Sequence, residues 1–210
     1  MGTLNKQEEI NVIKIGNRLS ILSTIGRSTY SSDECQILIT SDGAFGDGKH
    51  PTTHLCLLAI EKHIKPGDSF FDIGTGTGIL SIAAAKLGAC PILAIDIDHN
   101  AVRTAKENIT INQLEKKIRV EEGSLTAAKE MVNKKNKYSL VAANISAQVI
   151  LNLFDYDLAM AISPGGLLIL AGFLPMQTPA IRARLKWNDL KIVAEERRKD
   201  WICIIAKMPK

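Results

Sequence analysis

Short apolar runs alternate with longer amphipathic stretches from about residue 68 to residue 172. The runs have the length of buried strands, and the stretches between them have the period of amphipathic helices. Such strand–helix alternation predicts a parallel sheet covered by helices on both faces. The predicted strands are SFFDI, PILAIDI, IRVEEG, YSLVAAN and GLLILAG, and the predicted helices are GILSIAAAKLG, DHNAVRTAKENITIN, a short one near residues 125–134, and SAQVILNLFDYDLAMAI.

The pattern changes at both ends of the chain. Residues 12–40 hold three short apolar runs that predict a small hairpin and one more strand, and a helix of about residues 52–64 follows a glycine-rich stretch. At the other end, LKIVAEERRKDWICIIAK predicts two strands joined by a tight charged turn, which completes seven strands with an antiparallel hairpin. We therefore expect a tail and β extension over residues 1–40 and one α/β domain over residues 41–210.

Composition adds limits on partners and location. The formal net charge of +4 neither requires nor excludes a nucleic-acid partner. No apolar stretch approaches the roughly 20 residues of a membrane span, and the first eleven residues lack the apolar core of a secretory signal. The four cysteines show no CxxC pair and no zinc spacing, so they predict buried, reduced thiols and a cytoplasmic protein.

The turn after the first predicted strand of the alternating region carries three glycines, Gly74, Gly76 and Gly78, behind Asp72. A glycine-rich turn between a strand and a helix lets a ligand lie against backbone amides and the helix start. The spacing does not match the dinucleotide fingerprint G-x-G-x-x-G. It follows the D-x-G-x-G-x-G form of S-adenosylmethionine-dependent methyltransferases, whose cofactor carries an ammonium that suits Asp72.

Three further strand ends carry polar groups that would face the same crevice. Asp96 lies 22 residues after Gly74, where a carboxylate can accept both ribose hydroxyls. Ser124 follows the third strand, near the adenine edge, and Asn144 ends the fourth, beside the reactive end of the cofactor. Each group alone has a simpler interpretation as a solvated turn or a turn former, but four successive strand ends together predict a cofactor site.

A family resemblance narrows this prediction. AFGDGKHPTTHLCL, residues 44–57, resembles the AFGTGxHPTT signature of the bacterial methyltransferases that modify the eleventh protein of the large ribosomal subunit, and the later motifs agree in order over residues 12–208. The resemblance implies a Rossmann-like class I methyltransferase fold and N-methylation of lysine side chains or an N-terminal amine of that protein, with S-adenosylmethionine as cofactor. It implies that Thr53 and Asn144 orient the acceptor nitrogen, and cofactor contacts from Phe45, Thr53, Gly74, Asp96 and Asn144.

The chain departs from the family pattern in two places. Asp47 stands where the family has threonine, either to attract a cationic acceptor or as an exposed loop substitution. Family members also carry an N-terminal recognition domain, whereas residues 1–40 resemble only the linker to it. Three explanations stay open: the substrate is recognised in a different way, the chain is truncated, or the substrate is another protein.

Other functions fit the residues less well. His50 and His54 are spaced i, i+4 without a carboxylate or cysteine at ligand spacing, so no metal site is expected. The glycine spacing disfavours a nicotinamide oxidoreductase. A small-molecule methyltransferase and a non-catalytic cofactor-binding module stay open as alternatives. The favoured hypothesis, a protein methyltransferase, requires a protein substrate as partner. It requires neither a membrane nor direct binding of nucleic acid.

Overall fold

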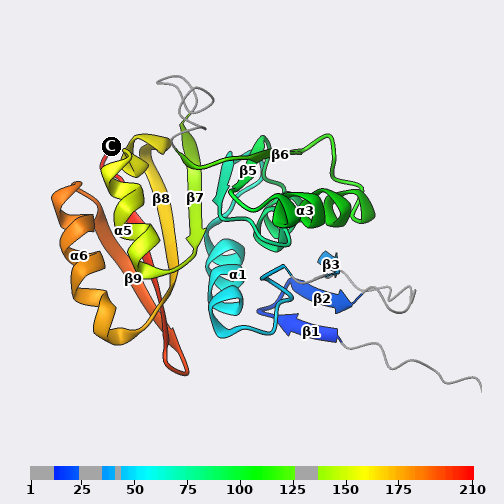
Figure 1. The fold of residues 1–210 in the computed structure, drawn as a ribbon, viewed down its shortest axis with the longest axis horizontal. Helices are drawn as coiled ribbons and strands as arrows, with labels where there is room; N and C mark the ends of the chain where they lie inside the picture. The colour runs from blue at the N-terminus through cyan, green and yellow to red at the C-terminus, as the bar shows by residue number, and fades with distance from the viewer. Residues whose placement is uncertain (1–11, 24–34, 41–43, 126–136) are drawn as a thin grey trace, which may run out of the picture.

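The computed structural model describes residues 12–23, 35–40, 44–125 and 137–210. Its main sheet has seven strands in the order β6-β5-β4-β7-β8-β10-β9 (Figure 1). All neighbours from β6 to β8 are parallel, and β10 runs antiparallel to both β8 and β9. This confirms the predicted sheet and its closing hairpin. The strands are β4 (Phe70–Ile73), β5 (Ile92–Asp96), β6 (Ile118–Glu122), β7 (Tyr138–Asn144), β8 (Ile162–Phe173), β9 (Lys191–Arg198) and β10 (Trp201–Lys207).

The strand order reverses at the centre of the sheet. From β4 the chain builds outward through β5 and β6, then crosses back to place β7 and β8 on the other side of β4. In open α/β sheets such a reversal leaves a crevice beyond the carboxyl ends of the two central strands. The predicted site residues at the ends of β4, β5 and β7 are therefore brought to one edge of the sheet.

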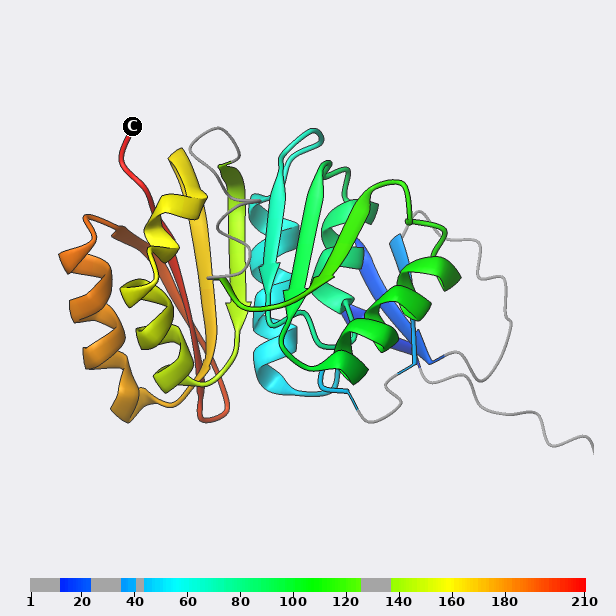
Figure 2. The same cartoon turned by 45° about the horizontal axis from the view of Figure 1, so that its top comes forward.

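Helices cover both faces of this sheet (Figure 2). On one face, α1 (Pro51–His63), α2 (Ile79–Lys86) and α3 (His99–Ile111) share a hydrophobic cluster with the strands. On the other, α5 (Ala147–Asp155) and α6 (Thr178–Trp187) share a second one. Both faces of the parallel strands are thus buried, which explains why their sequences are continuous apolar runs. No helix of the described residues is long and apolar enough to cross a membrane.

The helix boundaries follow local capping chemistry. The Oδ1 of Asp98 accepts a hydrogen bond from the backbone N–H of Asn100 at 2.9 Å, so Asp98 caps α3. At the end of α2, Gly88 adopts a φ of 101° and the N–H of Ala89 returns to the carbonyl of Ala84 at 2.9 Å. This is the Schellman arrangement, in which a glycine ends the helix.

The N-terminal residues form a separate small sheet. β1 (Val12–Ile15) and β2 (Leu19–Ser23) form the predicted hairpin, and β3 (Cys35–Ile39) pairs parallel to β2. Ile15, Leu19 and Ile37 are buried in the same hydrophobic cluster as α1 and α2. The extension therefore packs on the helical layer of the domain rather than standing apart from it.

Several sequence-based expectations were wrong in detail. The helix predicted over residues 146–162 ends at Asp155, because Asp157 adopts a left-handed φ of 65° and a 3₁₀ turn, η1 (Leu158–Ala161), follows. The SPGG segment lies within β8 as an irregularity in its pairing with β7, not before the strand. α6 was not predicted, and Cys90 is exposed rather than buried. The helix expected near residues 125–134 lies almost entirely outside the described residues, so it stays a prediction.

Candidate active site

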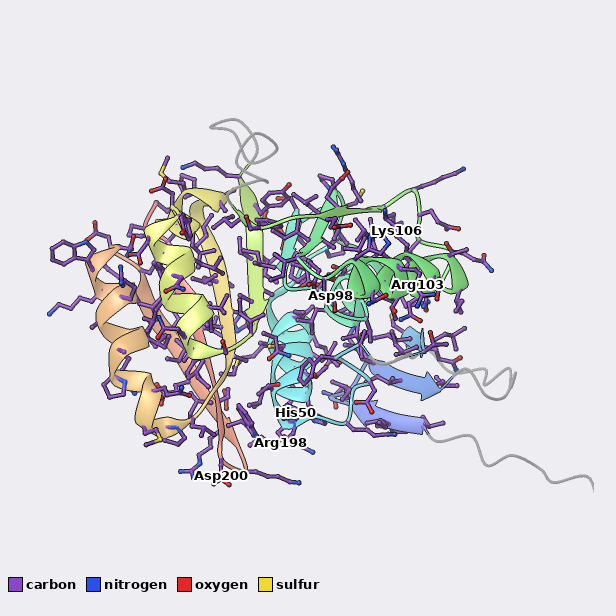
Figure 3. The ribbon with its side chains drawn as sticks, in the orientation of Figure 1. His50, Asp98, Arg103, Lys106, Arg198 and Asp200 are labelled. Atoms are coloured by element: carbon purple, nitrogen blue, oxygen red, sulfur yellow. The ribbon has the colours of Figure 1, made fainter. Side chains whose placement is uncertain are left out.

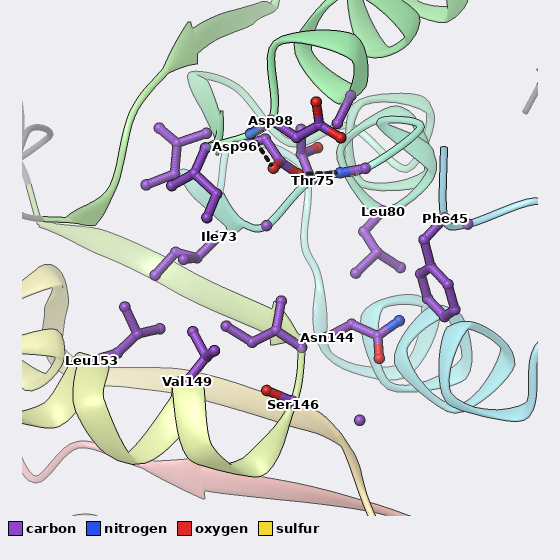
Figure 4. Close-up of a pocket in the computed structure, with 18 of the residues that line it drawn as sticks. Phe45, Ile73, Thr75, Leu80, Asp96, Asp98, Asn144, Ser146, Val149 and Leu153 are labelled. Atoms are coloured by element: carbon purple, nitrogen blue, oxygen red, sulfur yellow. Dashed lines mark hydrogen bonds between the residues drawn. The ribbon is translucent and has the colours of Figure 1, made fainter. Parts of the chain in front are cut away.

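A cavity of about 790 Å³ opens where the central strands end (Figure 4). Its walls come from the carboxyl ends of β4, β5 and β7, the start of α1, the first turns of α5 and the loop before α1. Most of the predicted site residues line it, whereas Asp72 and Gly78 do not. The predicted residues on its wall are Phe45, Thr53, Gly74, Gly76, Asp96, Ser124 and Asn144.

Asp96 is held by backbone donors at the end of β5. Its Oδ2 accepts from the N–H of Gly76 at 2.9 Å, and its Oδ1 accepts from the N–H of Asp98 at 3.0 Å. Each carboxylate oxygen has two lone-pair sites, so one acceptor position on each oxygen remains. A fixed carboxylate with two open acceptor positions on the cavity wall fits a vicinal diol such as a ribose.

The glycines of the turn make room for the protein itself. Gly76 has a φ of +56°, and a Cβ there would lie 2.3 Å from the carbonyl oxygen of Phe45. A Cβ on Gly74 would meet the Cγ2 of Ile145 at 2.5 Å. Gly78 is not on the cavity wall and lies against Ala105 of α3 instead, which corrects its predicted cofactor contact. We expected these glycines to make space for a ligand. In the structure, the absence of side chains at these positions also lets neighbouring segments of the protein pack closely against the turn.

We expect Gly76→Ala to destabilise the fold by at least about 2 kcal/mol, because it combines left-handed strain with a clash against backbone. Gly67→Ala is the matched control, since Gly67 also has a positive φ, of 87°, but nothing lies within 4 Å of a Cβ placed there. That control should cost about 1 kcal/mol, from strain alone. Urea denaturation of both variants gives the comparison, and equal losses would contradict the proposed clash.

Asp72 lies beneath the turn rather than on the cavity wall. Its side chain is fully buried, and its Oδ2 accepts from the hydroxyls of Thr75 at 2.7 Å and Ser81 at 2.8 Å. Its Oδ1 has no partner among the described residues. Burial raises the pKa of Asp72 to about 6, opposed by the hydrogen bonds from Thr75 and Ser81 and reinforced by the charge of Asp96. In this structure Asp72 holds the turn through these two hydroxyls, and its place near the ammonium of the cofactor stays a prediction.

The raised pKa of Asp72 predicts how stability changes with pH. Between the ordinary value of about 3.9 and the folded value of about 6, the folded protein binds more protons than the unfolded chain. The free energy of unfolding should therefore fall as pH rises from 4 to 7. In the wild-type protein this fall in the free energy of unfolding should be about 3 kcal/mol. Asp72→Asn keeps an acceptor oxygen but cannot ionise, so the fall should be absent in this variant. Urea denaturation of the cofactor-free protein across this range tests the expectation, and parallel profiles for the two proteins would refute it.

Asn144 and Thr53 lie next to each other on the cavity wall. Thr53 is fully buried on α1, and its Oγ1 accepts from the Nδ2 of Asn144 at 3.4 Å. The Oδ1 of Asn144 is buried and has no partner among the described residues. Because a buried carbonyl oxygen without a hydrogen bond is costly, its presence on a cavity wall indicates a donor supplied by a ligand. This amide oxygen is suited to accept a hydrogen from an amine.

An aromatic cluster at the cavity was not predicted from the sequence. The ring of His50 lies edge-on to Phe45, with centroids 5.2 Å apart, and to Trp201, at 4.8 Å. Thr52 donates its backbone N–H to the Nδ1 of His50 at 3.3 Å, so His50 caps α1, at whose start Figure 3 shows it. Trp201 was not among the predicted site residues. It reaches the cavity because β10 lies beside β8, a proximity that no local pattern reveals.

Asp47, where the sequence departs from the family signature, does not line the cavity. Its Oδ1 accepts from the backbone N–H of Lys49 at 3.0 Å, and its Oδ2 lies 3.6 Å from the Nζ of the same lysine. These contacts within the loop favour the interpretation of a local loop substitution over that of an acceptor-attracting charge.

Comparisons with known proteins agree with this architecture. The family model described as ribosomal protein L11 methyltransferase (PrmA) matches residues 4–209. Curated relatives named ribosomal protein L11 methyltransferase include one from Listeria monocytogenes (strain 10403S), 42% identical over 195 residues, and one from Bacillus cereus (strain AH820), 38% identical over 196 residues. Both alignments cover 93% of this chain, and the chain spans 60% and 61% of the two relatives.

Solved structures give the same result at the level of the fold. The crystal structure of ribosomal protein L11 methylase from Lactobacillus delbrueckii subsp. bulgaricus superposes with a TM-score of 0.82 at 32% identity, covering 95% of this chain and 99% of that one. A Streptococcus pneumoniae protein in complex with S-adenosyl-L-methionine superposes with a TM-score of 0.62 at 18% identity, covering 73% and 72%. The fold is thus the Rossmann-like fold of class I S-adenosylmethionine-dependent methyltransferases. Within that class, the chain belongs to the ribosomal protein L11 methyltransferase family.

Proposed function

We propose that this protein transfers methyl groups from S-adenosylmethionine to amino groups of a protein, namely lysine side chains or the N-terminal amine of ribosomal protein L11. The observation that carries the proposal is the buried Oδ1 of Asn144 on the wall of the cavity, which has no hydrogen-bond partner within the described part of the chain. Family membership supports the choice of substrate, since the relatives that share the fold and motifs are named for that protein.

The cavity fits the cofactor on several counts. Asp96 offers two open acceptor positions to a ribose, and Ser124 lies on the same wall, where the adenine edge would come. Gly74 and Gly76 line the cavity, and their backbone would lie against the amino-acid part of the cofactor, in the turn that the buried carboxyl group of Asp72 holds. A volume of about 790 Å³ leaves space for both a nucleoside and an incoming side chain.

S-adenosylmethionine, when bound, supplies an electrophilic methyl group on a sulfonium. The residues of the chain have to align a neutral amine with that methyl group. Thr53 holds the amide of Asn144, whose Oδ1 accepts one hydrogen of the amine and so directs the nitrogen lone pair. As the new N–C bond forms and the C–S bond breaks, the amine loses a proton to water at the cavity mouth.

We place this reaction in the cytoplasm, where ribosomal proteins are made. The four cysteines support this location, because all are free thiols and the exposed Cys90 is unpaired. The protein substrate is the partner that the proposal requires.

The test measures cofactor binding and methyl transfer together. Isothermal titration with S-adenosylmethionine should show binding, and incubation with radiolabelled cofactor and unmethylated L11 should label that protein. The Asn144→Ala variant is the negative control for transfer. Binding with no label in L11, as free protein or in large ribosomal subunits, would overturn the proposed substrate and favour a different protein or a small molecule. Absence of binding would overturn the proposed activity.

A further inference from the structure

Asn108, on α3, is a fully buried amide whose hydrogen-bonding capacity is completely used. Its Oδ1 accepts from the backbone N–H of Thr40 at 2.8 Å and from the hydroxyl of Thr40 at 3.1 Å. Its Nδ2 donates to the carbonyl of Thr40 and to the carbonyl of Thr77, both at 2.9 Å. A neutral amide has two hydrogens and two lone-pair sites, so none is left over. Asn108 therefore joins the residue after β3 to the glycine turn.

Asn112 makes similar contacts with β3 but none with the turn. Its Oδ1 accepts from the N–H of Leu38 at 3.1 Å, and its Nδ2 donates to the carbonyl of Leu38 at 2.7 Å. Four residues of helix advance about 6 Å and two residues of strand about 6.6 Å. Asn108 on α3 and Asn112 at the C-cap of α3 therefore meet Thr40 and Leu38, which lie two residues apart at the end of β3, the strand next to α3 (Figure 1).

Thr77 carries the network from Asn108 to the cavity wall. Thr77 is fully buried, its backbone N–H donates to the carbonyl of Phe45 at 3.0 Å, and its hydroxyl donates to the carbonyl of Gly46 at 2.7 Å. Phe45 and Gly46 line the cavity, whereas Thr77 and Asn108 do not. One chain of hydrogen bonds thus runs from α3 through the turn to the loop that closes one side of the site.

We propose that Asn108 is a positioning residue for the cofactor. Through Thr77 it holds the Phe45–Gly46 segment against the glycine turn before the cofactor binds. Without it, the carbonyl of Thr77 loses its buried donor and the segment is less restrained. Part of the binding energy then has to order the segment, which lowers the affinity. The inference rests on the proposed function, because it concerns the same cavity.

The test compares two asparagine-to-alanine variants. Asn108→Ala removes the side-chain hydrogen bonds to Thr40, and Asn112→Ala removes those to Leu38, but only the first variant disconnects the glycine turn. Titration with S-adenosylmethionine, below the melting temperature of each variant, should show affinity at least about tenfold weaker for Asn108→Ala and within about threefold of wild type for Asn112→Ala. Turnover at saturating cofactor should change little in either variant, so that Asn108→Ala raises KM without lowering kcat.

A second pair of variants leaves Asn108 in place. Thr77→Val keeps the side-chain shape but removes the hydroxyl that donates to Gly46, whereas Thr77→Ser keeps the hydroxyl. We expect Thr77→Val to weaken cofactor affinity and Thr77→Ser to remain close to wild type. If Asn108→Ala does not fold, the two Thr77 variants still test whether this network positions the Phe45–Gly46 segment.

The outcomes separate the inference from the proposed function. If the wild-type protein binds S-adenosylmethionine, and Asn108→Ala and Asn112→Ala bind it with equal affinity, the positioning role alone is overturned. Wild-type affinity in Thr77→Val would likewise overturn the positioning role alone. Failure of the wild-type protein to bind S-adenosylmethionine would overturn the proposed function, and the positioning role with it.

Discussion

Replacing Asp96 by alanine is expected to weaken the binding of S-adenosylmethionine by at least about a hundredfold, or about 2.7 kcal/mol. The variant removes the carboxylate that would accept both ribose hydroxyls, and charge-assisted hydrogen bonds contribute roughly 1.5–3 kcal/mol each. It also removes the acceptor of the Gly76 N–H, at 2.9 Å, so the glycine turn loses a restraint. Isothermal titration of the purified variant measures the loss directly.

Asp68→Ala is the matched control for this prediction. The Oδ2 of Asp68 also accepts from a backbone N–H, that of Lys65 at 2.9 Å, but Asp68 precedes β4 and does not line the cavity. Its loss should leave the cofactor affinity within about threefold of wild type. If Asp96→Ala bound the cofactor as tightly as Asp68→Ala, the assignment of Asp96 to the ribose would be wrong.

Asn144→Ala is expected to lower the rate of methyl transfer by about a hundredfold or more, because misplacing a reacting group costs on that order. Cofactor affinity should change far less, since the Oδ1 that is lost faces the acceptor amine in our proposal. Single-turnover transfer to L11 at saturating cofactor, together with titration, separates the two quantities. A variant that keeps wild-type turnover would refute the orienting role of Asn144.

Two comparisons isolate the cause of that loss. Asn188→Ala removes an asparagine whose Nδ2 donates to the carbonyl of Arg184 at 2.9 Å, away from the cavity, and should leave the transfer rate unchanged. Thr53→Ser keeps the hydroxyl that accepts from Asn144, and Thr53→Val removes it. Only the valine variant should reproduce part of the defect of Asn144→Ala. Equal rates in the two Thr53 variants would show that Thr53 does not hold the amide.

Local signals in the sequence were sufficient to predict most of the helices and strands. They were insufficient where a helix breaks or a strand is irregular. The buried strands read as apolar runs because both faces of the sheet are covered, and Asp98 and Gly88 mark helix ends by capping chemistry. The break after α5 depends on Asp157 in a left-handed conformation, which its residue type permits but does not demand. The entry of SPGG into β8 depends on pairing with β7, which is a long-range contact.

The sequence by itself determined the fold class, the order of the motifs and the edge of the sheet at which most of the predicted site residues meet, because parallel strands deliver their carboxyl ends to one edge whatever lies between them. Only the tertiary structure decided which of those residues face the cavity. It placed Asp72 beneath the turn and Gly78 against α3, since both depend on how helices pack over the strands. It also brought Trp201 to His50 and Asn108 to Thr77, contacts between distant segments that only the packing of the folded chain creates.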